Sequence, residues 1–435
     1  MTANQPPHIA FTPPLGYQEV NSALEGVTIF APQPIPSGVD AAKTFTCPKC
    51  GASLAYDVSA SGIACQHCGY QEKVQTQQVG QRAEEFEFTL ETLGKTEQGW
   101  GELRAEVHCE NCGAELSYPQ GAMATSCPYC ASNKVNVQIA EDDKLRPRFL
   151  VPFKLHANQI PTLVTNWLGL GWFHPPELSA NTIIRRFKGY YLPYWTFDAN
   201  IHANWRAEVG QQVTQRVYNA SEKRWETRTH IIWRWREGQV TVPIDDLLVI
   251  GVSNQHLSHR ILKNLEPFNL GSLVAYQPDY LAGLQAQAYD ITLPEAWETG
   301  KQSMRQAAKK ACESQVNSSY VRNFSMSADF ADESWRYILL PVYLAAYKYE
   351  GKVFQVMVNA QTGTVAGQKP VAWWKVWLAI AACLLPGLLT GLMGLPLLLL
   401  GGAGVILIIL GAILLIPGII GSVIIYRKAQ ESEAG

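Results

Sequence analysis

Alternating apolar and polar positions in the middle of the chain predict long β-strands. Along residues 224–236 the positions Trp225, Thr227, Thr229, Ile231, Trp233 and Trp235 alternate with mostly polar residues. Residues 190–202 form a second strand-like segment. A period of two places successive side chains on opposite faces of a sheet, so we expect one face of this sheet to be buried.

A helix and a β-meander are predicted after these strands. Pro294 is typical of the first turn of a helix, which we expect to end near Asn317. The chain then alternates between strands and turns at residues 337–349, 350–351, 352–358 and 359–363. Residues 145–370 are therefore expected to form one mixed α+β domain with a mostly antiparallel sheet, in which residues 290–368 are the helix plus meander.

The carboxyl-terminal part is of a different class, because residues 376–426 contain 51 consecutive positions without a charged side chain. One membrane-spanning helix needs about 20 apolar residues. We expect a transmembrane hairpin over residues 373–426, with spans at 373–393 and 403–426. Helices are the expected form because lipid cannot hydrogen-bond an open backbone.

The charges around this hairpin predict its orientation. Lys375 precedes the uncharged run and Arg427 and Lys428 follow it, whereas the loop between the spans has no charge. By the positive-inside rule both termini face the cytosol, and residues 427–435 form a cytosolic tail. The aromatic residues expected at the membrane interface are Trp373, Trp374, Trp377 and Tyr426.

Eight of the ten cysteines form two blocks of identical spacing. The first block is Cys47, Cys50, Cys65 and Cys68, and the second is Cys109, Cys112, Cys127 and Cys130. Each block reads C-x2-C, 14 residues, C-x2-C, and the offset between the blocks is 62 residues. Four thiolates in two close pairs match a structural tetrahedral Zn²⁺ site, so we expect two zinc ions. A dithiol redox pair is the alternative, and His67 and His108 adjoin the cysteines as alternative ligands.

The spacing of these blocks divides the front of the chain. Residues 1–43 contain seven prolines and are expected to be a disordered leader. Small β zinc ribbons are expected at residues 44–73 and 107–140, joined by an acidic linker at 74–106. The glycine after each first C-x2-C, Gly51 or Gly113, suits the positive φ of a metal-holding turn.

The charge of the front part argues against nucleic acid as its partner. Residues 1–144 carry 8 Lys and Arg against 17 Asp and Glu, whereas residues 145–370 carry 24 against 18. A phosphate backbone would be repelled from an acidic region that also holds four-thiolate zinc sites. Paired thiols kept free for metal indicate a reducing compartment, and the first 16 residues do not have the pattern of a signal peptide.

Other local patterns carry weaker hypotheses. The GKT at residues 94–96 fails as a P-loop because position 89 is Thr rather than Gly. His256 and His259 have a metal-chelating spacing without a third ligand nearby, and Cys312 and Cys383 are interpreted as small buried hydrophobes. A basic stripe that could contact anionic headgroups or simply face water consists of Lys301, Arg305, Lys309 and Lys310. Gly387 and Gly391 form a GxxxG pattern that permits close helix approach.

Several segments together resemble a bacterial family of membrane proteins with transcription factor IIB-type zinc ribbons. They are CPKCGA (47–52), CENCGA (109–114), LVPFKL (150–155), GYYLPYWTFDA (189–199) and LLPVYLAAYKYEGKVFQVMVNAQTG (339–363). Members are often labelled as similar to primosomal protein N′, a replication-restart helicase, through their zinc ribbons, but this chain departs from the helicase because it lacks the P-loop. Some relatives look like partners of phage-shock-protein A homologues in the envelope-stress response. The helix plus meander also resembles a PepSY-type module.

The leading hypothesis is a non-enzymatic, membrane-anchored zinc-ribbon scaffold or adaptor. It would bind protein partners at the cytosolic face of the bacterial inner (plasma) membrane, and the resemblance implies a phage-shock-protein A homologue as the partner. One alternative is a membrane-associated, replication-linked nucleic-acid-binding protein. The other is an enzyme whose site lies within residues 145–370. The oligomeric state is left open, and a homo-oligomer is compatible with the sequence.

Overall fold

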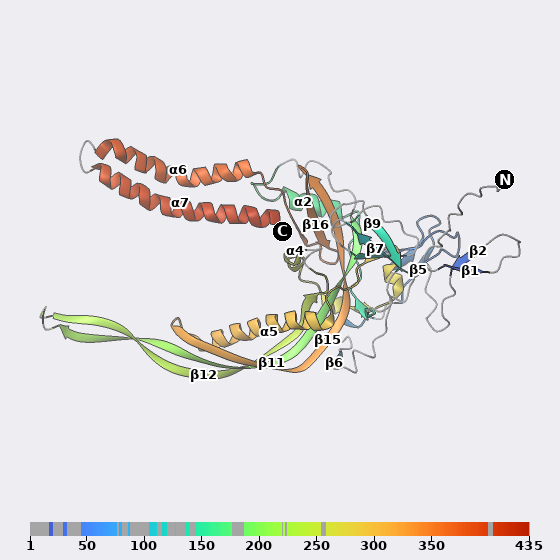
Figure 1. Ribbon diagram of the computed structural model, residues 1–435, viewed down its shortest axis with the longest axis horizontal. Helices are drawn as coiled ribbons and strands as arrows, with labels where there is room; N and C mark the ends of the chain where they lie inside the picture. The colour runs from blue at the N-terminus through green and yellow to red at the C-terminus, as the bar shows by residue number, and fades with distance from the viewer. Residues whose placement is uncertain are drawn as a thin grey trace, which may run out of the picture.

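The structure is a computed structural model of the whole chain. It describes residues 17–20, 29–32, 45–75, 78–80, 86–87, 104–110, 115–119, 127, 135–139, 145–175, 187–219, 221, 224–253, 258–398 and 403–434. Figure 1 shows a central β-rich body from which two long projections extend on the same side, one made of strands and one of helices.

Three long antiparallel strands form the centre of the body. They are β11 (Lys188–Asn219), β12 (Arg224–Ile250) and β15 (Val321–Tyr349). β11 lies in the middle and pairs with β12 on one edge and with β15 on the other. The expected mixed domain with a mostly antiparallel sheet is confirmed. The strands run well beyond the predicted segments 190–202, 224–236 and 337–349. In β11 one face stays buried from Ala203 to Val209, and pairing with β12 then continues through residues 211–218, which are not buried.

Helix α5 (Leu293–Val316) covers one face of this sheet. Its buried side recurs every three or four residues, at Ala296, Gly300, Met304, Ala308 and Cys312 among others, as expected for an amphipathic helix. Thr292 and Glu295 form a capping box at its start, and Asn317 ends it with a left-handed φ of 44°. The predicted helix from Pro294 to Asn317 is therefore confirmed within one residue at each end.

The opposite face is covered by α4 (His259–Asn264) and the 3-10 turn η2 (Leu270–Ser272). Beside them β15 continues into β16 (Lys352–Asn359) and β17 (Val365–Gly367), and α2 (Ile160–Gly169) contacts both of these strands. The predicted turn at residues 350–351 has positive φ at both positions. The side chain of Asn359 holds the second turn, because it accepts hydrogen bonds from the backbone N–H groups of Gln361 and Thr362. The predicted meander is confirmed.

Strands from the front of the chain pair with each other and with the body. The first ribbon is a separate three-stranded sheet in the order β3 (Ala55–Asp57), β4 (Gly62–Ala64) and β5 (Gln71–Lys73). The three strands of the second ribbon belong to the large sheet: β7 (Arg104–Cys109), β8 (Glu115–Pro119) and β9 (Val135–Ile139). Four short strands from other parts of the chain belong to it as well: β6 (Phe86–Glu87), β10 (Phe149–Leu150), β13 (Val274–Ala275) and β14 (Gln285–Ala286). The second ribbon is thus an extension of the body, through pairing of β8 with β14.

Two expected segment types differ from the structure. Within the leader expected to be disordered, β1 (Tyr17–Val20) and β2 (Ile29–Pro32) pair as an antiparallel hairpin. Within the expected linker, β6 pairs with β15 and β7 begins at Arg104. The hairpin pairs two segments of the leader itself, whereas β6 pairs with a strand far along the chain, and composition reveals neither pairing. The rest of residues 1–43 and most of residues 74–106 lie outside the described residues.

Two carboxyl-terminal helices, α6 (Trp373–Leu397) and α7 (Ala403–Ala434), are long and apolar enough to cross a membrane. Only 11% and 17% of their most apolar stretches are buried, whereas a core helix of the same composition would be covered. Both helices are longer than the expected spans. Residues 427–434, expected to be a tail, continue α7, because nothing in their sequence stops a helix.

Glycines form the contact between α6 and α7. A Cβ atom added to Gly411 would lie 2.6 Å from the backbone nitrogen of Gly391, and one added to Gly387 would lie 2.7 Å from Leu415. A Cβ on Gly391 itself would meet nothing within 4 Å. Within the GxxxG pattern, Gly387 needs to be glycine because a side chain there would meet α7. Gly391 contributes its backbone, which Gly411 of α7 approaches closely because Gly411 has no side chain.

Candidate metal centre

The first cysteine block forms two matching turns, each built around one C-x2-C pair. Gly51 donates its N–H to the Cys47 carbonyl oxygen at 2.9 Å, and Gly69 donates to the Cys65 carbonyl oxygen at 3.1 Å. Gly51 and Gly69 have φ values of +73° and +72°. A residue with a Cβ rarely adopts this left-handed conformation. The expected positive φ after the first C-x2-C is confirmed, and the same turn recurs at the second pair.

These turns bring four sulfur atoms together. The Sγ atoms of Cys47 and Cys68 are 3.4 Å apart, those of Cys50 and Cys65 are 3.6 Å apart, and all four ligand atoms lie within 4.8 Å of one another. A tetrahedral Zn²⁺ with bonds of about 2.3 Å would place its sulfur ligands about 3.8 Å apart. The four side chains are therefore compatible with one zinc ion. The group consists of cysteines alone, and the neighbouring His67 is not part of it.

The pKa values of the four thiols divide into two groups, since they are lowered for Cys47 and Cys65 and raised for Cys50 and Cys68. Hydrogen bonding from the backbone of Cys68 is the largest cause that lowers the pKa of the Cys65 thiol to about 6. Burial is the largest single effect on the Cys47 thiol and raises its pKa, but hydrogen bonds from the backbone of Lys49 and Cys50 and with the Cys68 and Cys50 thiols together lower the pKa. Since the thiolate is the form that ligates metal, these two buried cysteines are prepared for it.

The first ribbon is seated on the body through the 3-10 turn η3 (Pro278–Leu281) and the residues after it. Tyr56 donates its backbone N–H to the Ala282 carbonyl oxygen at 2.8 Å, and its ring lies 5.3 Å from that of Tyr280. The small ribbon core of Cys47, Leu54, Ile63 and Cys65 packs against Ala282. This seat holds the ribbon in place, while Cys50 and Cys68 stay exposed on its outer side.

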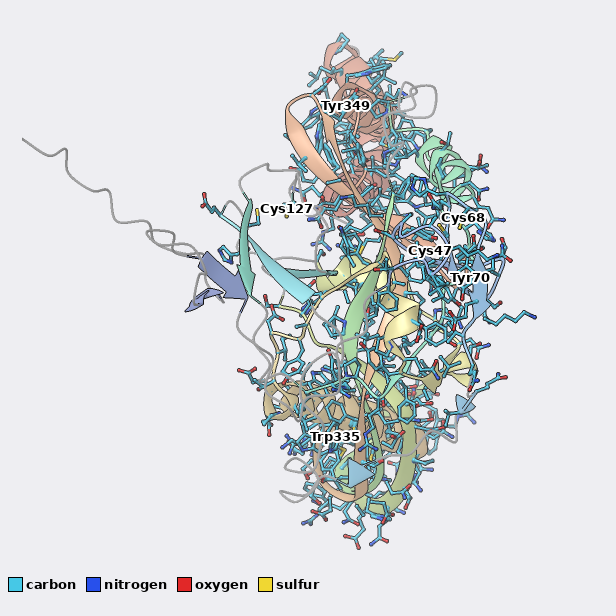
Figure 2. The ribbon with its side chains drawn as sticks, turned by 90° about the vertical axis from the view of Figure 1, so that its right-hand side faces the viewer. Cys47, Cys68, Tyr70, Cys127, Trp335 and Tyr349 are labelled. Atoms are coloured by element: carbon cyan, nitrogen blue, oxygen red, sulfur yellow. The ribbon has the colours of Figure 1, made fainter. Side chains whose placement is uncertain are left out.

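The second cysteine block is only partly within the described residues. Cys109 and Cys127 are both buried, at 0% and 1% exposure, and belong to the core on the α4 side of the sheet. Cys112 and Cys130 lie outside the described residues. Figure 2 shows Cys47, Cys68 and Tyr70 on one side of the long strands and Cys127 on the other. The second predicted zinc site therefore stays a prediction, with two of its four ligands placed.

The chain is similar to a Bacillus subtilis protein. Over 342 residues it is 24% identical to the uncharacterized protein YdjG of strain 168, and the alignment covers 77% of this chain and 92% of YdjG. No family model matches the chain. No solved structure matches it.

A carboxylate cluster beside a buried arginine was not predicted from the sequence. Arg336 of β15 is 1% exposed and forms ion pairs with Asp246 of β12 and Asp198 of β11. Its Nε donates to the Thr196 hydroxyl at 3.2 Å, and Asp246 donates its N–H to Asp198. The cluster joins the three long strands at the point where the register of β11 shifts. We interpret it as a structural lock, because the guanidinium charge neutralises the carboxylates that face it.

A cavity of about 330 Å³ lies between the end of β12, α4 and α5. Its walls are mainly Leu247, Leu248, Val249, Ile250, Leu262 and Ile291. Glu266 lines it as well, and burial raises the pKa of this carboxyl group. The enzyme alternative requires a polar pocket with a perturbed carboxylate or histidine, and this mainly apolar cavity supplies only the perturbed carboxyl group of Glu266.

The remaining sequence candidates have ordinary surroundings. His259 contacts the Val252 carbonyl oxygen at 2.8 Å, whereas His256 and residues 94–96 lie outside the described residues. Cys312 is fully buried on the inner face of α5, as expected for a small hydrophobe, and Cys383 is half-buried in α6. In the basic stripe, Lys301 and Lys309 form ion pairs with Glu298 and Glu313 of the same helix.

Proposed function

We propose that the protein is a non-enzymatic scaffold anchored in the bacterial inner membrane, and that its zinc ribbons and α+β domain bind protein partners at the cytosolic face. The observation that carries the proposal is the four-cysteine cluster seated on the body with its outer side exposed. Zinc sites of this closed type stabilise small folds and leave no coordination position for a substrate. A rigidly held ribbon is therefore suited to recognition.

The outer side of the first ribbon offers a small recognition surface. Cys50, Cys68 and Lys49 are exposed there, and the Lys49 ammonium lies 5.7 Å from the centre of the Tyr70 ring. The Tyr70 hydroxyl donates to the Glu72 carboxylate at 3.1 Å. Tyrosine is enriched at protein–protein interfaces and their rims are polar, so Tyr70 would be the central contact, with Lys49 and Glu72 at its rim.

Contacts between the domain and the end of α7 support the anchor. The Lys369 N–H donates to the Ser432 carbonyl oxygen at 2.9 Å, and the Lys352 ammonium donates to Glu433 at 3.1 Å. Arg260 of α4 forms a 3.5 Å ion pair with Glu431. These contacts hold the end of α7 next to the start of α6, so both outer ends of the hairpin meet the domain on one side. Positive charge at those ends then favours the cytosol for the domain and both termini.

The resemblance of the sequence to membrane proteins with transcription factor IIB-type ribbons suggests the partner. Some of those relatives look like recruiting platforms for phage-shock-protein A homologues. We therefore extend the proposal to such a homologue as partner and to the envelope-stress response as setting.

Affinity purification in mild detergent tests the scaffold proposal. The wild-type chain is compared with Lys49→Glu, which reverses one charge on the outer side and leaves all cysteines in place. Cys65→Ser removes one ligand, and Cys312→Ser serves as a matched control that changes a buried cysteine of α5. We expect partners to be lost from the first two variants and kept in the control. Recovery of the same partners from all four proteins would exclude the first ribbon as a binding surface.

A further inference from the structure

The cavity between β12, α4 and α5 lies at an open edge of the large sheet. Consecutive residues of β12, 247–250, all line it. Successive side chains of a strand point to opposite faces. Leu248 and Ile250 pack against the core on the α4 side, whereas Leu247 and Val249 pack in the core on the α5 side. A cavity that touches all of these residues therefore faces the edge of the strand, and we call it the edge groove.

The backbone of β12 presents unpaired hydrogen-bonding groups to the edge groove. Among the described residues β12 pairs with β11 alone. Gly251 donates its N–H to the Pro193 carbonyl oxygen at 2.9 Å, and in an antiparallel pair every second residue forms such bonds. The N–H and C=O groups of Leu248 and Ile250 therefore point away from β11. They have no hydrogen-bond partner within the described part of the chain.

The walls of the edge groove differ on its two sides. On the α4 side the buried Leu262 makes the wall apolar. Exposed polar residues complete that side: His259, Lys263 and Glu266. On the α5 side Ile291 is joined by the hydroxyl-bearing Thr299 and Ser303. The volume of about 330 Å³ is in the range of specific binding sites and accommodates the side chains of a short extended segment.

An extended peptide is the ligand whose chemistry matches this arrangement. Donors and acceptors that recur along an open strand edge are complemented by another extended backbone, which adds to the sheet as a strand. A compact apolar molecule would contact the walls but leave the backbone groups of Leu248 and Ile250 unpaired, which costs free energy. A second copy of the chain would bring its own α4 and α5 against those of the first. Lys263 and Glu266 have opposite charges, which suits a segment of low net charge.

We propose that the edge groove binds an extended segment of a partner protein as an additional strand antiparallel to β12. This inference rests on the scaffold function proposed above. The antiparallel direction is favoured because its pairing is slightly more stable per residue. Residues of the segment opposite Leu248 and Ile250 then lie on the same face as these two and meet the apolar α4 side. The residues between them meet Thr299 and Ser303, so the segment alternates apolar residues with small or hydroxyl-bearing ones.

Fluorescence polarisation with the full chain in mild detergent tests the inference. The probe is the heptapeptide ETVTVTK, labelled with fluorescein at its amino end. With its valines opposite Leu248 and Ile250, the valine N–H groups face β12 and the threonine N–H groups face away. Methylation of both valine nitrogens should weaken binding by about tenfold or more, because each methyl group removes a hydrogen bond. Methylation of the last two threonine nitrogens adds the same bulk and should change the affinity by less than about threefold.

Two variants of α5 show where the peptide binds. Thr299→Trp places a large ring in the edge groove from an exposed position, so the fold should be kept while the peptide binds about tenfold more weakly or worse. Ser314→Trp adds the same ring at an exposed position of α5 that does not line the groove, and the affinity should change by less than about twofold.

Hydrogen exchange identifies the strand edge directly. The bound peptide should slow exchange of the Leu248 and Ile250 amides, because they gain hydrogen bonds. The amide of Val249 already bonds to β11 and should not change. Electron-transfer fragmentation in the mass spectrometer resolves these neighbouring amides.

Several results would overturn strand addition at the edge groove. They are absence of binding at about 1 mM peptide, a selective loss with the methylated threonines, and an equal loss with both methylated peptides. Equal binding of all three peptides would assign the groove to apolar ligands instead. A chain that is dimeric, becomes monomeric in Thr299→Trp and does not bind the peptide would assign it to a second copy.

Affinity purification separates the edge groove from the scaffold function. If the wild-type chain recovers partners but does not bind the peptide, the edge groove is refuted and the scaffold function stands. If the peptide binds with the expected selectivity but the wild-type chain recovers no partner, the scaffold function is refuted and the groove stands as a peptide-binding site. Both are supported if partners are lost from Thr299→Trp and kept in Ser314→Trp, together with the expected peptide selectivity.

Discussion

Removal of one zinc ligand should unfold the first ribbon and leave the rest of the protein folded. Cys65→Ser replaces a ligand that is 3% exposed and lies 3.6 Å from the sulfur of Cys50. The serine hydroxyl is a poor zinc ligand at neutral pH, because metal sites of this type require deprotonated sulfur. We expect the wild-type chain to hold two zinc ions and the variant to hold one.

The small apolar core of this ribbon shows how much of its stability depends on zinc. Apart from the two buried cysteines, its fully buried apolar residues in the described part of the chain are Leu54 and Ile63. Burial of each stabilises the fold by about 1.5–3 kcal/mol, so together they contribute about 3–6 kcal/mol. A structural zinc ion contributes about 10–16 kcal/mol in small zinc domains. Most of the stability of the ribbon therefore comes from the metal, and the seat against Ala282 is too small to replace it.

Zinc content and hydrogen exchange measure the two consequences separately. Zinc per chain is determined by elemental mass spectrometry, and amide exchange is followed in peptides covering residues 45–75. Cys65→Ser should lose one ion and lose protection in this segment, while peptides of β11 and α5 should not change. Cys312→Ser is the matched control, because it alters a buried cysteine outside the cluster, and it should keep both ions. Two ions in Cys65→Ser, or a still protected Tyr56 amide, would refute the reasoning.

Three further changes have outcomes that the structure specifies. Arg336→Met should lower the free energy of unfolding by about 3–5 kcal/mol, measured by thermal unfolding, because it leaves Asp246 without its cation in a nearly buried position. Gly411→Ala should loosen the α6–α7 hairpin, measured by crosslinking between the helices, because its Cβ would lie 2.6 Å from the Gly391 nitrogen. Acidification should release the end of α7 from the domain, measured by exchange of residues 427–434. Burial lowers the pKa of His174, whose ring contacts the Pro370 carbonyl oxygen and Ser432. The unfolded chain then binds more protons than the folded one, so this stability is present above about pH 6.5 and decreases as the pH falls.

Each of these three changes has a control variant at the same site or next to it. Adding Asp246→Asn to Arg336→Met should recover part of the lost stability, since it removes the uncompensated charge. Gly391→Ala should be tolerated, because a Cβ there meets nothing within 4 Å. His174→Phe should abolish the pH effect. An equal effect of both glycine variants, or pH dependence that survives in His174→Phe, would contradict the corresponding argument.

Much of the first metal site could be predicted from the sequence. The spacing of Cys47, Cys50, Cys65 and Cys68 depends on turns of a few residues, and Gly51 and Gly69 close those turns locally. The seat of the ribbon could not be predicted, because Tyr56 contacts Ala282 more than 200 residues away. The second block also has a part that could be predicted and a part that could not. Its cysteine spacing repeats that of the first block, whereas the pairing of its β8 with β14 depends on the body.

The sequence by itself determined the features that have local causes. These are the cysteine spacing, the amphipathic α5, the meander turns and the uncharged run that forms α6 and α7. Only the tertiary structure decided where the long strands gain or lose their neighbours. Alternation reads the same in a two-stranded and a three-stranded sheet, so residues 210–233 gave no sign that they would project as an arm. The same holds for the Arg336 cluster, whose partners lie 140 positions away at Thr196, because such contacts exist only once the strands have paired.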